Sequence, residues 1–220
     1  MKFKKDNYVV AKKVVSKEIA QFLFNYLLIR RQCLKTLTDT KQISPFDYTW
    51  GVMGDKQVDD TFGFYADLAM ETLLLRTLPI MEKQTGSKLI PTYSYCRLYK
   101  HGDELKRHKD RASCEISTTL FLGGEPWPIF LSPYENVGHA GPKTKATFSS
   151  KAKGIKVNLD VGDMLIYKGA ILEHWREKFG GTDCAQVFLH YNTDSPENRF
   201  RQFDTRPHVG LPSYCKQPGA

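Results

Sequence analysis

The chain has 220 residues, 41% of them hydrophobic and 12% aromatic, with a formal net charge of +8. That length and composition suit a single domain over residues 1–220, with enough apolar material for a packed core. The apolar stretches are interrupted and far shorter than a membrane span, and Asp6 and Asn7 stand where a signal peptide needs apolar residues. We therefore expect a soluble, cytoplasmic protein with no membrane partner.

The cysteines and lysines narrow the classes of binding site. The five cysteines are scattered without a CxxC pair, which argues against a disulfide framework and a structural zinc site. Five lysines lie between Lys143 and Lys156, a stretch that could be a solvated loop or could bind nucleic acid or an acidic protein. Few aromatic residues are interleaved with these lysines, which argues against nucleic acid as a partner.

The first part of the chain has the pattern of a strand followed by helices. Tyr8–Val15 is rich in β-branched residues and predicts a short strand, after which Ser16 can cap a long helix with apolar i, i+3, i+4 spacing. Residues 38–57 contain proline and glycine and predict a loop. A second helix is predicted over 60–84, with Gly86 suited to its end.

After residue 91 the pattern changes to short β-rich segments separated by turn residues. Helices followed by many strands predict an α+β fold, with the helices of residues 1–90 packed on one sheet. Residues 91–195 are expected to close as a double-stranded β-helix, the jelly roll of the cupins, and residues 196–220 form a tail. The predicted strands are Thr92–Tyr99, Glu115–Leu122, Ile129–Leu131, Ile155–Leu159, Met164–Tyr167 and Ala185–Tyr191.

Three residues have the types and spacing of a metal site. His108 and Asp110 are two apart, so on an extended segment their side chains point to the same side. His174, after a distant predicted strand, supplies a third donor. Two histidines and one carboxylate on one face form the ligand set of non-haem iron(II) oxygenases, which leaves positions open for other ligands. An HxD pattern alone is weak, because a strand histidine is more often a hydrogen-bonded core residue.

The motifs around these residues occur in a recognisable order. Leu98–Asp103 leads into the HxD, Thr119–Glu125 carries a Thr-Leu strand and Gly-Gly-Glu, and Gly162–Tyr167 precedes the distal histidine. With these motifs, residues 93–192 resemble the catalytic core of the 2-oxoglutarate/iron(II) oxygenase superfamily, in particular its prolyl 4-hydroxylase branch. The segment Tyr8–Leu37 is similar to the strand and helix that open that family's chain.

The resemblance implies roles for specific residues. His108, Asp110 and His174 would bind Fe(II), and Tyr99 would hydrogen-bond the carboxylate of 2-oxoglutarate. The sequence departs from the family at the lysine that binds the cosubstrate's distal carboxylate, because that position is Cys184.

No lysine or arginine lies between Lys178 and Arg199, so the following strand supplies no substitute. A buried carboxylate needs a cationic or hydrogen-bonding partner. Strand geometry offers Arg176, two residues beyond His174, as the first candidate. Arg97, two residues before Tyr99, is the second.

The implied activity is hydroxylation of an unactivated C–H bond, consuming O2 and 2-oxoglutarate and releasing succinate and CO2. The branch implies a peptidyl proline as substrate. A free amino acid or other small metabolite, a non-catalytic cupin-like metal-binding protein, and nucleic-acid demethylation are alternatives. Trp127 could line a substrate groove or belong to the core, and residues 133–154 and the tail 201–220 could cover the entrance. The sequence leaves the oligomeric state open.

Overall fold

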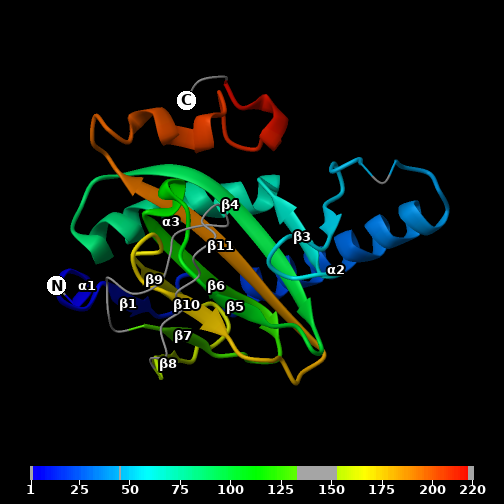
Figure 1. Ribbon diagram of the computed structural model, residues 1–220, viewed down its shortest axis with the longest axis horizontal. Coiled ribbons are helices and arrows are strands. Elements are labelled where there is room, and N and C mark those ends of the chain that lie inside the picture. The colour runs from blue at the N-terminus through cyan, green and yellow to red at the C-terminus, as the bar shows by residue number, and fades with distance from the viewer. Residues whose placement is uncertain (1, 45, 133–152, 218–220) are drawn as a thin grey trace.

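The computed structural model describes residues 2–44, 46–132 and 153–217, and it consists of two antiparallel sheets with helices on one side (Figure 1). The strands are β1 (Tyr8–Ala11), β2 (Val52–Met53), β3 (Phe62–Tyr65), β4 (Leu89–Lys100), β5 (Leu105–His108), β6 (Ile116–Gly124), β7 (Ile129–Leu131), β8 (Ile155–Val157), β9 (Met164–Tyr167), β10 (His174–Arg176) and β11 (Asp183–Thr193). The α-helices are α1 (Lys2–Asp6), α2 (Lys17–Asp39) and α3 (Leu68–Thr85), and the 3-10 helices are η1 (Ala112–Cys114), η2 (Arg199–Thr205) and η3 (Ser213–Cys215).

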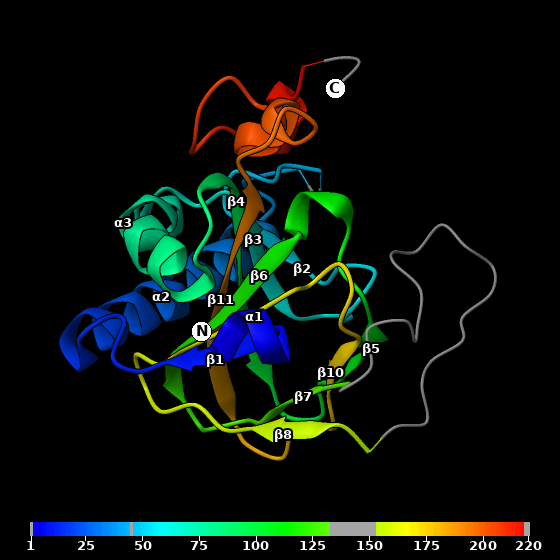
Figure 2. The same ribbon diagram turned by 90° about the vertical axis from the view of Figure 1, so that its left-hand side faces the viewer.

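The large sheet has seven strands in the order β1-β9-β6-β11-β4-β3-β2, and the small sheet has four in the order β5-β10-β7-β8. Figure 2 shows α2 and α3 on one side of the large sheet and the small sheet on the other. The predicted α+β fold with a double-sheet jelly roll and helices against one sheet is therefore confirmed. Because strands β4, β6 and β11 lie in the middle of the large sheet, they are covered on both faces.

Alternation along these three strands divides the core into two layers. Leu98, Leu120 and Val187 point outward and pack with α2 and α3. Their neighbours Tyr99 and Phe121 point inward, toward the small sheet. The inward face is therefore where polar and chemically useful side chains of the long strands gather.

The helix boundaries follow from capping residues. Ser16 accepts a hydrogen bond from the Ile19 amide at 3.2 Å, as the sequence predicted, and Gly86 ends α3 with φ of 69°. The predicted helix over 60–84 is wrong at its start, because Asp67 accepts from two backbone amides and caps the helix there.

The residues just before that cap form a strand. β3 pairs antiparallel with β4, with Phe62 opposite Leu98. The predicted first strand is also shorter than expected, since it ends at Ala11 and Lys13 has φ of 52°. The predicted loop 38–57 holds the end of α2 and the short strand β2.

Two further expectations concern the lysine-rich stretch and membrane-spanning helices. Residues 133–152, with most of the lysine-rich stretch, lie outside the described residues. Within the described ranges, no helix combines the length and the apolar run that crossing a membrane requires.

Candidate active site

Neighbouring strands of the small sheet bring the two distant histidines together. β5 ends at His108 and β10 begins at His174, and these residues are direct partners in the antiparallel register. Their ring centroids are 4.2 Å apart. A pair separated by 66 positions in sequence thus meets because two short strands, neither of them predicted from the sequence, are adjacent.

Asp110 completes the group. Its Oδ1 lies 3.7 Å from Nε2 of His108 and 3.5 Å from Nε2 of His174. Its Oδ2 accepts a hydrogen bond from the Ser117 hydroxyl at 2.6 Å, which fixes the carboxylate so that Oδ1 faces the histidines. A side chain at Gly169 would collide with both the carboxylate and this hydroxyl, so only glycine allows the chain to pass there.

The protonation states suit a cation. Nδ1 of His108 lies 2.8 Å from the Lys106 carbonyl and Nδ1 of His174 lies 3.0 Å from the Leu172 carbonyl, so each Nδ1–H donates and each Nε2 keeps its lone pair. Burial and the neighbouring His174 imidazole lower the pKa of His108 to about 4. Although burial opposes ionisation, the histidines hold the pKa of Asp110 well below its usual range.

The donor atoms of the three residues lie within 4.8 Å of one another. Two neutral imidazole nitrogens and one carboxylate oxygen, turned to one point, form the set that non-haem iron(II) prefers. The residues present therefore fit an iron ion, and they leave the side toward the cavity open to other ligands.

Arg176 lies on the same strand as His174 and points into the space between the sheets. It is 1% exposed, and it donates to the Trp127 carbonyl and, at 3.1 Å, to the Thr119 hydroxyl. Its Nε has no hydrogen-bond partner, and no carboxylate of the described residues pairs with it. Burial lowers the pKa of this arginine, which reflects the cost of an enclosed positive charge.

Arg97 is buried too but already has an acidic partner. Its guanidinium donates to the Asp55 carboxylate, to Gln57 at 3.3 Å and to the Tyr99 hydroxyl at 3.2 Å. Of the two arginines predicted from strand geometry, Arg176 is thus the one with unused capacity for an anion.

Tyr99 of β4 and Cys184 of β11 are direct partners in the antiparallel register. Both are 0% exposed, and burial raises the pKa of the Cys184 thiol, so this thiol is neutral and supplies no counter-charge to Arg176. Trp127 belongs to the core, packed edge-on to Tyr99 with its ring nitrogen donating to the Glu177 carbonyl at 2.9 Å.

A cavity of about 570 Å³ opens beside the histidines. It is lined by His108, Asp110 and His174 and by a group of tyrosines and tail residues that the sequence did not single out. These are Tyr65, Tyr93, Tyr95, Tyr167, Ser213 and Lys216. Tyr93 and Tyr95 share the inward face of β4 with Tyr99, so period-two alternation from Tyr99 could have found them. The tail positions gave no such signal.

Comparison with known proteins supports the same fold. No family model matches the chain, and a search of curated proteins gives no match. Among solved structures, a prolyl-4-hydroxylase of Pseudomonas putida aligns with a TM-score of 0.51 at 12% identity, over 88% of this chain and 96% of that one. HygX of Streptomyces hygroscopicus, solved with nickel and 2-oxoglutarate, aligns with a TM-score of 0.54 at 12% identity, over 87% and 85%.

The chain shares its fold with these solved structures. SnoN, a non-haem alpha-ketoglutarate-dependent epimerase from nogalamycin biosynthesis, aligns with a TM-score of 0.59 at 13% identity, over 87% of this chain and 80% of that one. The prolyl hydroxylase does not stand out among these structures, so the prolyl 4-hydroxylase branch remains a prediction. At such identities the likeness concerns the fold, and the chemistry is inferred from the site itself.

Proposed function

We propose that the protein is an Fe(II)- and 2-oxoglutarate-dependent dioxygenase that hydroxylates an unactivated C–H bond, with release of succinate and CO2. The observation that carries this proposal is Arg176. A guanidinium buried between the sheets without an acid is costly unless an anionic ligand binds it. A dicarboxylate that also reaches the metal group one strand step away would be such a ligand.

The proposed roles follow from the contacts. His108, Asp110 and His174 hold the iron, which when bound supplies the activation of dioxygen and the oxidation of the substrate. Arg176 binds the distal carboxylate of 2-oxoglutarate, and the Thr119 hydroxyl, which accepts from Arg176 and donates to Gln186 at 2.8 Å, orients the guanidinium. Because the Tyr99 oxygen accepts from Arg97, its own O–H is free to donate to the same cosubstrate.

Two substrate classes have support. A peptidyl proline, implied by the sequence resemblance, would suit the tyrosines that line the cavity, since aromatic faces pack well on a pyrrolidine ring. A free amino acid or other small metabolite is the second class, because Ser213 and Lys216 of the tail form part of the cavity wall. Succinate production in the presence of proline peptides or of free amino acids distinguishes the two.

The first test is anaerobic titration of the iron(II)-loaded protein with 2-oxoglutarate. We expect the visible charge-transfer band of a chelated 2-oxo acid to appear and saturate, because the three ligands leave positions open for both chelating oxygens. If iron binds and no band forms, the cosubstrate is wrong. A non-catalytic metal-binding protein would then be the better description.

His174→Ala is expected to abolish iron binding and turnover, because it removes one of three donors from a buried site. Iron content after loading and succinate formation are the measurements, and circular dichroism checks that the fold is kept. His101→Ala is the matched control, since His101 is exposed and outside the cavity. A His174→Ala protein with iron and wild-type turnover contradicts the proposed ligand set.

A further inference from the structure

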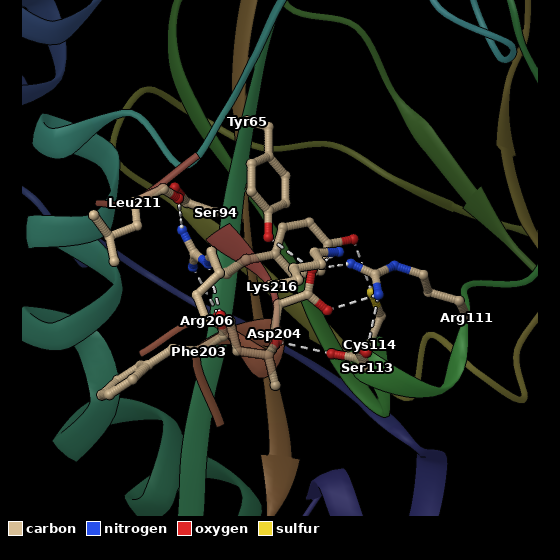
Figure 3. A network of polar contacts seen from close by, with 12 residues as sticks. Tyr65, Ser94, Arg111, Ser113, Cys114, Phe203, Asp204, Arg206, Leu211 and Lys216 are labelled. Atoms are coloured by element: carbon tan, nitrogen blue, oxygen red, sulfur yellow. Dashed lines mark hydrogen bonds and ion pairs between the residues drawn. The ribbon is translucent and has the colours of Figure 1, made fainter. Parts of the chain in front are cut away.

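The C-terminal tail is attached to the rim of the cavity through one buried carboxylate, Asp204 of η2 (Figure 3). Arg111 donates from Nη1 to Oδ1 at 2.7 Å and from Nη2 to Oδ2 at 2.6 Å. The Tyr65 hydroxyl donates to Oδ2 at 2.7 Å, and Nζ of Lys216 lies 2.7 Å from the same oxygen. Two cations and a phenol therefore share a single acid.

The two cations and the acid differ in their access to the cavity. The side chain of Asp204 is 2% exposed, whereas those of Arg111 and Lys216 are 44% and 36% exposed. Arg111 and Lys216 also line the cavity, and Asp204 does not. The carboxylate thus lies beneath the cations, and both cations border the cavity, with Arg111 also donating to the Ser113 hydroxyl at 3.0 Å.

Around Asp204, two positive charges meet one negative charge. Asp204 compensates only one of Arg111 and Lys216. The other acids that line the cavity are Asp55, which pairs with Arg97, and Asp110, which faces the histidines. Among the described residues, neither of these two acids forms an ion pair with Arg111 or Lys216, so Asp204 is the one acid that the two cations share.

The aromatic side chains and the tail backbone hold these cations in place. The Arg111 guanidinium lies over the Tyr93 ring at 4.5 Å, and Nζ of Lys216 lies over the Tyr65 ring at 5.5 Å. In the tail, residues 203–205 have φ of 52°, 57° and 67°, an unusual run for residues with side chains. Such a conformation persists only when its surroundings over-determine it, so the cationic wall is preorganised.

We propose that Lys216, together with Arg111, forms an anion subsite that binds a carboxylate of the substrate. This inference rests on the proposed function and deepens it. It limits the substrate to molecules that carry a carboxylate in addition to the carbon that is hydroxylated. The carboxylate belongs either to a free acid or to an acidic residue next to the modified residue of a peptide. Lys216 is thereby a specificity-determining residue contributed by the tail.

The test measures binding of matched acids and amides by calorimetry, under anaerobic conditions with iron(II) and excess 2-oxoglutarate. The first pair is the free acid N-acetyl-L-proline and its neutral amide N-acetyl-L-prolinamide. The peptide probes are capped tripeptides with glutamate or glutamine beside proline. We expect one acid to bind at least about tenfold more tightly than its neutral partner, as for a hydrogen bond to a charged group. The pair with this preference identifies the source of the carboxylate.

Variants separate the subsite from the fold. Lys216→Gln is expected to reduce the preference for the acid to about threefold or less, since Arg111 and Asp204 then form a neutral pair. Lys216→Arg restores the charge and should restore the preference. Lys83→Gln, at an exposed position of α3 outside the cavity, should behave as the wild-type protein.

Two outcomes overturn the inference. One is a wild-type protein that binds no acid more tightly than its amide, and the other is a Lys216→Gln protein that keeps the full preference. Repeating the titrations without iron and 2-oxoglutarate distinguishes this failure from that of the proposed function, because the cationic wall needs neither. A preference for acids with no charge-transfer band supports the subsite and contradicts the dioxygenase.

Discussion

Arg206 in the tail and Arg176 in the barrel are buried to nearly the same degree, at 3% and 1% exposure, in very different surroundings. Nη2 of Arg206 lies 3.0 and 3.1 Å from the two carboxylate oxygens of Glu71 on α3. Its Nε and Nη1 donate to the carbonyls of Phe203 and Leu211, each at 2.6 Å. Every nitrogen of this guanidinium has a partner.

Arg176 has neither an acid among the described residues nor a partner for its Nε. The difference indicates that Arg206 has a structural role and that Arg176 is suited to bind a ligand. A buried ion that is paired and fully hydrogen-bonded holds two elements together. A buried ion whose bonds are incomplete raises the free energy of the empty protein, and this cost is recovered when an anion binds.

The largest effect that tests this comparison is expected for Arg206→Leu. Removing one partner of a buried pair leaves Glu71 charged and unpaired, so the free energy of unfolding should fall by about 3–5 kcal/mol. Urea unfolding measures the change. Replacing both residues, in Glu71→Leu with Arg206→Leu, should recover part of the loss. If Arg206→Leu is as stable as the wild type, the ion pair between Arg206 and Glu71 does not contribute to the stability of the protein.

Arg176→Leu is expected to behave in the opposite way. Because Arg176 has no acidic partner among the described residues, the substitution leaves no buried acid unpaired. The free energy of unfolding of the ligand-free protein should therefore stay unchanged or rise. The affinity for 2-oxoglutarate should fall at least about tenfold, as for the loss of a charged hydrogen bond of 1.5–3 kcal/mol. Anaerobic titration of the charge-transfer band gives the affinity.

Arg97→Leu serves as the comparison for this prediction, because Arg97 already pairs with Asp55. We expect it to lower stability more than it lowers 2-oxoglutarate affinity. If the affinity for 2-oxoglutarate is unchanged in Arg176→Leu and falls strongly in Arg97→Leu, then Arg97 and not Arg176 binds the distal carboxylate.

Local sequence signals predicted most of the fold, and tertiary pairing determined the rest. Ser16, Gly86 and the β-rich segments between turn residues correctly gave the start of the first helix, the end of the second and the strands β4, β6, β9 and β11 of the large sheet. β5 and β10 are too short for a periodic pattern, so their pairing was not visible. The predicted helix wrongly includes β3, because the sequence pattern does not show that Asp67 caps the helix.

The candidate site divides in the same way. The sequence motifs and strand geometry named His108, Asp110, His174 and Arg176, and the structure brings the first three within ligand distance of one another. The Asp204 network was not predicted, because Arg111 and the tail are far apart in sequence and no repeat or spacing connects them. The sequence allowed the tail to cover the entrance, but only its packing in the structure reveals that Lys216 lines the cavity.

The smallest effect expected from the comparison is a difference in acid sensitivity between the two regions. Although burial opposes ionisation, Arg111 and Lys216 hold the pKa of the Asp204 carboxyl well below its usual range. A carboxyl with a depressed pKa in the folded protein contributes stability that is fully present above its unfolded pKa of about 4 and is lost as the pH falls toward the folded value. Among the described residues, no acid pairs with Arg176, so this guanidinium adds no such dependence. Urea unfolding at pH 6 and below pH 4 should therefore show a steeper loss for the wild type than for Asp204→Asn. Equal losses would mean that these ion pairs do not hold the tail on the cavity.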